Sequence, residues 1–339
     1  MRWLRGIGLA LLLVVAALAA PILYVEAACR PQGAPQGYAS LLPERDRRPE
    51  ARTLLTWPEW HVVHAYDDYA AVIADAPPHA FDFWRSIRGF WDGLCDMSRA
   101  SGPHGGFDAG TKQMAYVVGA SFTAELALKA LYEETVGRLF ALGGRSDADA
   151  ISAAQAADYA AFLTQTPWYL YDFREDAAEL SAATGTLRDA ERRAALGIEY
   201  WAKALYGGVI EDAVGAVGAD ALTMRSVIDG IDPVRLRGME GVTVIGPVEE
   251  GAVIETPRYR AFTEMLPMLA EAGGRFVEIA GNDEIMVTAL ADAPYEDALR
   301  SMERQGYGDV RSLILMPVSE LLGFVRDPGP MRLEHVHDY

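Results

Sequence analysis

Apolar residues recur every three or four positions between residues 57 and 218, which is the period of helices that each bury one face. The pattern is clearest over 78–99, where the apolar residues fall within about 120° of one another on a helical projection and the charged residues fall outside that arc. These apolar residues are Phe83, Trp84, Ile87, Phe90, Trp91 and Leu94. We therefore predict a core-facing aromatic stripe here, within an all-α domain over 53–220.

Helix boundaries within this domain follow from capping and breaking residues. Thr56 is suited to cap the first helix, with Pro58 in its first turn, and Gly143-Gly144 ends a long one. The predicted helices cover about 57–74, 78–99, 111–142, 149–164, 167–182 and 186–217.

Beyond residue 240 the hydrophobic period shortens toward two, which is typical of strands. From Ala252 the predicted order is β-α-β-β-α-β, with helices over 257–274 and 294–306. This order is that of a ferredoxin-like domain, which we place over 240–326. The fold class is thus α+β. Residues 327–339, which carry His335, His337 and Asp338, are predicted to be a tail.

The amino-terminal segment has the composition of a membrane anchor. Arg2 and Arg5 precede residues 6–25, which contain no charge and as a helix would be ~30 Å long, the thickness of a bilayer core. Since a positive amino end stays in the cytoplasm, we predict a single-pass signal anchor over 1–28 in a bacterial inner membrane, with the later domains periplasmic. A signal peptide cleaved after the small residues of "VEAA" is the alternative, and it stays open.

Residues 29–52 are rich in proline, glycine and charge, which predicts a linker between the anchor and the folded part. The two cysteines are Cys29, in this linker, and Cys95. In an oxidising compartment they would form a disulfide that contributes ~4 kcal/mol. Two unpaired thiols are the other interpretation, and the sequence leaves both open.

The formal net charge of −18 is spread along the chain. An acidic protein is repelled by phosphate backbones, so we exclude nucleic acid as a partner. The partners that we expect are the inner membrane, through residues 6–25, and an envelope protein or a second copy of the chain.

The stretch "TWPEWHVVHAYDDYA" raises the question of a metal site. On a helix, His61, His64 and Asp68 share one side and could ligate one ion. The main apolar face of the same helix lies elsewhere, and it is formed by Val62, Tyr66, Tyr69 and Ile73. We therefore favour solvated side chains over a metal site at these three residues.

Glu125 is the strongest candidate for a catalytic residue. It lies within an apolar stripe of the long helix, where a buried carboxylate needs a partner and tends to have a raised pKa. Ser121 and Tyr132, one and two turns away, are its expected hydrogen-bond donors. A surface ion pair with Lys129 is the alternative.

The glycine-rich loop "ASGPHGGFDAGTKQ" precedes that helix, where His104, Thr111 and Lys112 are suited to hold an anion. Its spacing does not match a nucleotide-binding loop, and the "GAS" at 119–121 lacks the second glycine of a nucleophile elbow. The sequence therefore specifies no cofactor.

Three strings, "WPEWHVVHAYDDYA", "FWRSIRGFWDGLC" and "VGASFTAELALKALYEETVGR", resemble an uncharacterised group of bacterial membrane-anchored proteins. The resemblance covers about 53–142. It implies a protein of the bacterial envelope and supplies no catalytic residue.

Two hypotheses on function follow. In the first, the chain is a non-catalytic binding or accessory protein of the envelope. In the second, it is an enzyme or a metal-binding protein with a site in the helical bundle around Glu125, His61 and His64. The missing catalytic signatures favour the first.

Overall fold

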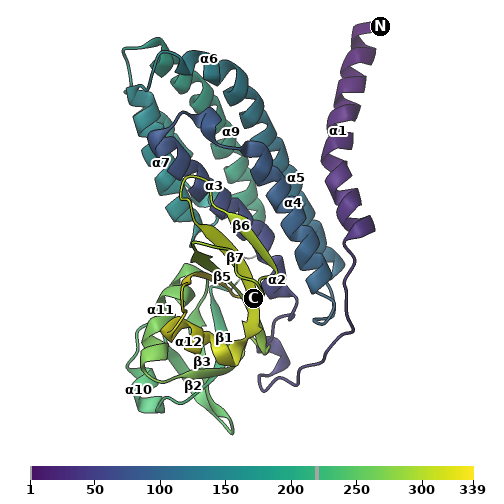
Figure 1. Cartoon of the computed structure of the whole chain (residues 1–339), viewed down its shortest axis with the longest axis vertical. Helices are drawn as coiled ribbons and strands as arrows, with labels where there is room; N and C mark the ends of the chain where they lie inside the picture. Colours follow the sequence, from purple (N-terminus) through teal and green to yellow (C-terminus); the bar gives the residue numbers. More distant parts are fainter. Residues whose placement is uncertain (1, 218–220) are drawn as a thin grey trace.

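The computed structural model describes residues 2–217 and 221–339, so 218–220, at the end of the predicted helical domain, lie outside the described residues, as does Met1. A bundle of helices makes up one half of the molecule and a sheet domain lies at one end of it (Figure 1). Helix α1 (Arg2–Ala28) stands beside the bundle. The predicted α+β class is confirmed.

The bundle follows the predicted helices closely. Its helices are α2 (Arg52–Leu55), α3 (Trp57–Asp75), α4 (Phe83–Ala100), α5 (Ala109–Tyr132), α6 (Arg138–Ala141), α7 (Asp147–Leu163), α8 (Phe173–Leu180) and α9 (Leu187–Val217), with a π-helical turn, Glu133–Gly137, between α5 and α6. Asp82, Asp108 and Ser146 accept hydrogen bonds from the first turns of α4, α5 and α7 and so fix where these helices begin. The helix predicted from 167 starts only at Phe173, because a 3-10 turn precedes it.

The aromatic stripe of α4 forms the centre of the bundle core. Phe83, Phe90 and Leu94 are fully buried, and they pack with Tyr69 of α3 and Phe122 of α5. Trp84 departs from the prediction, because 46% of it is exposed. It lies at the edge of the predicted arc, on the side of α4 that faces water.

Two antiparallel sheets make up the second domain. The first contains β1 (Thr223–Asp229), β2 (Thr243–Val248), β3 (Gly251–Pro257) and β4 (Arg275–Ile279), and the second contains β5 (Glu284–Ala291), β6 (Arg300–Glu303), β7 (Val310–Pro317) and β8 (Arg332–His337). Three helices accompany them: α10 (Pro233–Arg237), α11 (Arg260–Glu271) and α12 (Val318–Arg326). Both sheets have the same order, in which the second strand is followed by the third, the first and the fourth.

The βαββαβ unit predicted from Ala252 is wrong as placed, because its strands are divided between the two sheets. The domain also begins earlier than predicted, at β1. The helix expected over 294–306 does not form; this segment contains β6 instead. Leu299 and Met302 pack against a tryptophan cluster of the bundle, and this tertiary contact overrides local helix propensity.

The predicted tail is also wrong, because residues Arg332–His337 form β8. This strand pairs antiparallel with β5, so the end of the chain is a buried edge of the second sheet. Tyr339 is fully buried, and its hydroxyl donates to the carbonyl of Glu284. The sequence did not predict this strand because His335 and His337 are polar, and polar residues at the end of a sequence are typical of a solvated tail.

The second sheet lies between two cores. Ile285 and Val287 of β5 pack in a core with α11, α12 and the first sheet. On the other face of the sheet, Met286 and Leu313 pack against the bundle, in a cluster completed by Leu54, Trp57, Trp60 and Met97. The strands therefore bring the carboxyl-terminal residues against α3, which positions the residues described below.

Residues 29–51 form a strap across both domains rather than a free linker. The amide of Gln32 donates to the carbonyl of Arg99 at the end of α4, at 2.8 Å, and the amide of Arg48 donates to the carbonyl of Ala280 after β4, at 2.8 Å. A disulfide joins Cys29 to Cys95, so the interpretation as a disulfide is confirmed and that as two unpaired thiols is wrong.

Among the described residues, one helical stretch, Ala109–Ala141, is long and apolar enough to cross a membrane by length and composition. Within α1, Leu12–Ala28 is a shorter apolar stretch. The carboxyl-terminal end of α1 is fastened to the bundle, where Val25 is fully buried.

Candidate functional site

The side of α3 that carries His61, His64 and Asp68 is buried. These residues are 7%, 6% and 8% exposed, so the expectation of solvated side chains is wrong. The second sheet covers this side of the helix: β8 lies against its start, and the β6–β7 hairpin lies further along. The sequence pattern of α3 alone could not predict this burial, because the strands that cover the helix are more than 230 positions away in the sequence.

The three side chains have different partners. His61 Nε2 donates to the carbonyl oxygen of Ser86 at 2.8 Å, since a carbonyl only accepts. His64 lies 3.8 Å from Glu334, while Asp68 accepts from the amide of Gln305 at 3.0 Å. The donor atoms of these three residues do not converge on one point within the described part of the chain.

Burial keeps the histidines at this interface neutral. It lowers the pKa of His61 to about 4 and that of His337 to about 3, and it holds the pKa of His64 and of His335 well below the usual value. His335 and His337, whose ring centroids are 5.1 Å apart, lie with Trp60 at the start of α3. The Nε2 atoms of His64, His335 and His337 have no hydrogen-bond partner among the described residues.

Asp68 lies beside a pair of buried arginines from the second sheet. Arg304 and Arg311 are each 3.8 Å from its carboxylate, and Arg311 also makes two hydrogen bonds to Glu334 on β8. Burial raises the pKa of Asp68 to about 6, although both arginines act in the opposite direction. Charged side chains thus join α3 to β7 and β8 in this part of the interface.

Glu125 has polar partners inside the bundle, as predicted, but these partners are not the residues that we expected. It accepts a hydrogen bond from the hydroxyl of Tyr66 on α3 and forms an ion pair of 2.7 Å with Lys203 on α9. Ser121 is exposed, and Tyr132 donates instead to Glu191. The expected roles of Ser121 and Tyr132 are therefore wrong.

The alternative, an ion pair between Glu125 and Lys129, is wrong too, because Lys129 pairs with Glu199 at 3.1 Å. Lys203 also lies 3.1 Å from Glu199 and under the rings of three aromatic residues. Lys129, Glu199, Lys203 and the three aromatic residues line a cavity of about 30 Å³, which is room for one or two water molecules.

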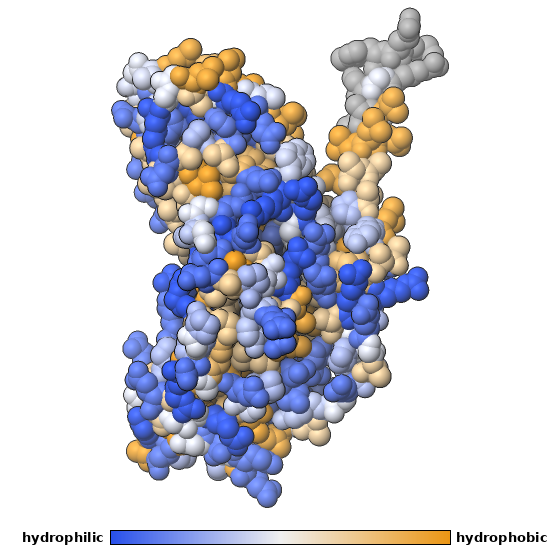
Figure 2. Space-filling view, in the orientation of Figure 1, coloured by the Kyte–Doolittle hydropathy of each residue, from blue (hydrophilic) through white to orange (hydrophobic). Residues whose placement is uncertain are grey.

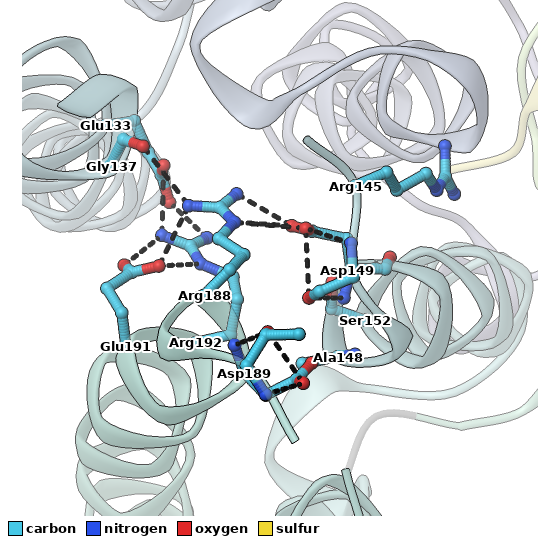
Figure 3. A network of polar contacts seen from close by, with 12 residues as sticks. Glu133, Gly137, Arg145, Ala148, Asp149, Ser152, Arg188, Asp189, Glu191 and Arg192 are labelled. Carbon is cyan, nitrogen blue, oxygen red and sulfur yellow. Dashed lines mark hydrogen bonds and ion pairs between the residues drawn. The ribbon is translucent and has the colours of Figure 1, made fainter. Parts of the chain in front are cut away.

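The acceptor of Tyr132, Glu191, belongs to a separate network between α5, α7 and α9 (Figure 3). Arg192 lies between Glu133 and Glu191, at 2.7 and 2.6 Å, and Arg188 bridges Glu191 and Asp149, at 2.8 and 2.7 Å. The π-helical turn after α5 contains Glu133, and Gly137 leaves the space that its carboxylate occupies. Each arginine and carboxylate here is matched by opposite charge, as in a structural network.

A third polar group joins parts of the chain that the sequence did not connect. His104, in the loop between α4 and α5, has its Nδ1 3.3 Å from Glu50 of the strap and its Nε2 3.6 Å from Glu284 at the start of β5. One donor atom of each residue lies within 4.8 Å of the other two, which makes this the described group with the geometry of a metal site. Only 3% of the His104 side chain is exposed.

Negative charge is concentrated around His104. Burial lowers its pKa, but the hydrogen bond and charge of Glu50, with the charge of Glu284, raise it to a net value above normal. Burial and the charge of Glu50 raise the pKa of the adjacent Asp283, and burial raises that of Glu284. Three carboxylates thus surround one imidazole, an arrangement that binds a proton or a cation.

The anion site predicted in the same loop is not assembled. Thr111 donates to Asp108 at the start of α5, and Lys112 forms an ion pair of 2.8 Å with Glu26 of α1. His104 turns toward carboxylates, which repel anions.

No family model matches this chain, and neither a curated protein nor a solved structure matches it.

Proposed function

We propose that this chain is a membrane-anchored protein of the bacterial envelope that acts by binding rather than by catalysis. The charge-free segment 6–25 supports the anchor. The disulfide between Cys29 and Cys95 supports an oxidising compartment for the rest of the chain, because such bonds are rare in the cytosol. The resemblance of residues 53–142 to membrane-anchored proteins agrees with this placement.

The ligand that the geometry supports best is a divalent metal ion held by Glu50, His104 and Glu284. The observation that carries this is the convergence of one imidazole nitrogen and two carboxylate oxygens within 4.8 Å. Nitrogen and oxygen donors of this kind suit zinc, manganese or iron(II). A bound ion would tie the strap to the second sheet and to the loop before α5, and would offset the repulsion among the carboxylates.

Metal content and calorimetry test this proposal. The full chain, purified in detergent without a histidine tag and stripped with a chelator, is titrated with Zn²⁺ and Mn²⁺. We expect one equivalent to bind, and His104→Gln and Glu284→Gln each to weaken binding at least tenfold. His79→Gln, at a histidine outside the cluster, serves as the control and keeps the affinity of the wild type.

The same titration examines the site predicted on α3. If His61→Ala abolishes binding while His104→Gln does not, the metal lies in the bundle and the strap site is wrong. If neither ion binds the wild type, His104 is an imidazolium that bridges two carboxylates, and the metal proposal fails.

We further propose that each half of the sheet domain is a ferredoxin-like unit. What supports this is the order of strands, since both antiparallel sheets place their second strand beside the third, the third beside the first, and the first beside the fourth. α10 and α11 supply the two connections of the first half, and α12 supplies the second connection of the other half. Tandem units of this kind agree with a role in association.

A further inference from the structure

Long stretches of helices α5 and α9 have an outer surface without charge. Along α5 from Met114 to Leu131 the exposed side chains are Met114, Val117, Ser121, Leu128 and Leu131. Along α9 from Ala194 to Val209 the exposed residues are Ala194, Ile198, Trp201, Ala202, Leu205, Tyr206, Gly208 and Val209. Leu128 is 70% exposed and Trp201 68%. Apolar exposure on this scale marks an interaction surface.

The charged residues of the same stretches face inward. Lys129 pairs with Glu199, and Lys203 pairs with Glu125 and lies 3.1 Å from the hydroxyl of Tyr66 in the interior. These pairs hold α5 and α9 side by side, so their outer rows form one surface, which we call the α5–α9 face. In a water-soluble bundle the apolar side chains face inward and the charged ones face outward. Here the charged side chains face inward and the apolar ones face outward, which is typical of helices exposed to lipid.

The α5–α9 face continues onto the anchor. Glu26, in the last turn of α1, forms an ion pair with Lys112 at 2.8 Å and accepts a hydrogen bond from Tyr116 at 2.7 Å. The last turns of helix α1 therefore lie beside the start of α5, and α1 exposes Leu12, Leu13, Val14, Val15 and Leu23. The helical stretch that begins with α5 is also the described one that is apolar and long enough to cross a membrane.

The side of the bundle along α4 is different. Arg88 is exposed on α4, and Arg85 contacts Glu303 of β6. Hydrophilic side chains cover much of the view in Figure 2, while hydrophobic ones gather on α1 and at the end of the bundle near α6. Exposed apolar residues are thus concentrated along α5 and α9, on α1 and at the α6 end of the bundle, as in amphipathic units that insert into a membrane from one face.

We propose that the α5–α9 face contacts the acyl chains of the bilayer next to α1, so that the bundle is itself in contact with lipid and does not stand off the membrane on a linker. The proposal rests on the membrane anchoring by α1 proposed above. The partner is lipid rather than a second copy, because the surface is continuous with the apolar surface of α1 and has charged residues only on its inner side.

Site-directed labelling tests the proposal in the full chain. Because Cys29 and Cys95 are paired, an added cysteine is the one free thiol. Bimane is attached at Leu128→Cys, Leu205→Cys, Val15→Cys or Arg88→Cys, and each protein is reconstituted into vesicles of phosphatidylethanolamine and phosphatidylglycerol, 3:1. Quenching by doxyl-labelled lipid is then compared with quenching by iodide in water.

We expect labels at positions 128 and 205 to be quenched by lipid at least threefold more than the label at position 88, and to resist iodide. If lipid quenches the label at position 15 but not those at positions 128 and 205, the result supports α1 as the anchor and overturns the inference that the bundle contacts lipid. Lack of quenching at position 15 would overturn the anchor itself. A disulfide between two copies through position 128, at low protein-to-lipid ratio, would also overturn lipid contact and assign the face to a second copy.

Discussion

The imidazole of His335 stacks on the indole of Trp60, with ring centroids 3.4 Å apart and planes tilted by 27°. This contact joins β8, the last strand of the chain, to the first turn of α3. His337 lies beside it and shares a hydrogen bond of 3.0 Å with Thr56, while the hydroxyl of Thr53 donates to the His337 carbonyl at 2.6 Å. The two domains are therefore joined through neutral histidines rather than through a flexible tail.

Acid should destabilise this interface. The folded pKa of His61 is lowered to about 4 and that of His337 to about 3, below the unfolded value of ~6.5. Their contribution is complete above pH 6.5 and is lost as pH falls, because only the unfolded state then takes up the protons. The expected loss is about 1.4 kcal/mol per pH unit for each histidine. Urea unfolding of the full chain in detergent, between pH 7.5 and 5, measures it.

A matched variant separates these histidines from other groups. Asp68 acts in the opposite sense, since its pKa is raised to about 6 and the folded state takes up its proton first. His337→Gln should therefore show a shallower fall of stability below pH 6.5 than the wild type. Parallel curves for the two proteins would mean that His337 is not held neutral by the fold.

The disulfide gives a second prediction. Closing the loop between Cys29 and Cys95, which are 66 positions apart, should stabilise the fold by ~4 kcal/mol, because it restricts the unfolded chain. Cys29→Ala should lower the free energy of unfolding by about that amount. In protein taken from its native membrane, a maleimide–polyethylene glycol reagent should add to no cysteine before reduction and to both after it. Labelling before reduction would contradict the pairing.

The sequence predicted the bundle because its helices bury local, periodic faces: Phe83, Phe90 and Leu94 recur at helical spacing and all enter the core. The sequence did not predict that His64 and His335 are buried. His64 lies on α3 and is covered by β8, whereas His335 lies on β8 and is covered by α3. The helix expected over 294–306 failed for a related reason, since packing of Met302 on the bundle decides its conformation.

For the candidate sites, periodicity placed Glu125 inside the bundle but could not name its partners. Ser121 and Tyr132 were chosen because they are near in sequence, whereas Tyr66 and Lys203 reach Glu125 from α3 and α9. The grouping of Glu50, His104 and Glu284 joins residues as many as 234 positions apart, and no pattern within one segment could have indicated it.

Glu125 should prove structural when it is removed. In Glu125→Leu the ammonium of Lys203 loses its 2.7 Å partner and the hydroxyl of Tyr66 loses its acceptor. Because Glu125 is one-third exposed, we expect a loss of about 2 kcal/mol, between the values for surface and buried pairs. Glu134→Leu, at an exposed carboxylate in the π-helical turn after α5, should change stability by less than about 0.5 kcal/mol. A gain of stability in Glu125→Leu would instead identify an unsatisfied acid retained for function.

Among the charged residues of the bundle, Arg192 should be the one whose substitution lowers stability most. Its side chain is fully buried and forms ion pairs with both Glu133 and Glu191 (Figure 3). Arg192→Met leaves both carboxylates buried without their shared partner, and we expect a loss of about 3 to 5 kcal/mol in urea unfolding. The double variant Arg192→Met with Glu133→Gln should recover part of this loss, because one of the buried charges is then gone. Arg138→Met, at an exposed arginine of α6, controls for the change of residue type and should be nearly neutral. If the single and double variants lose equal stability, repulsion between the stranded carboxylates is not the cause, and lost packing around the arginine is.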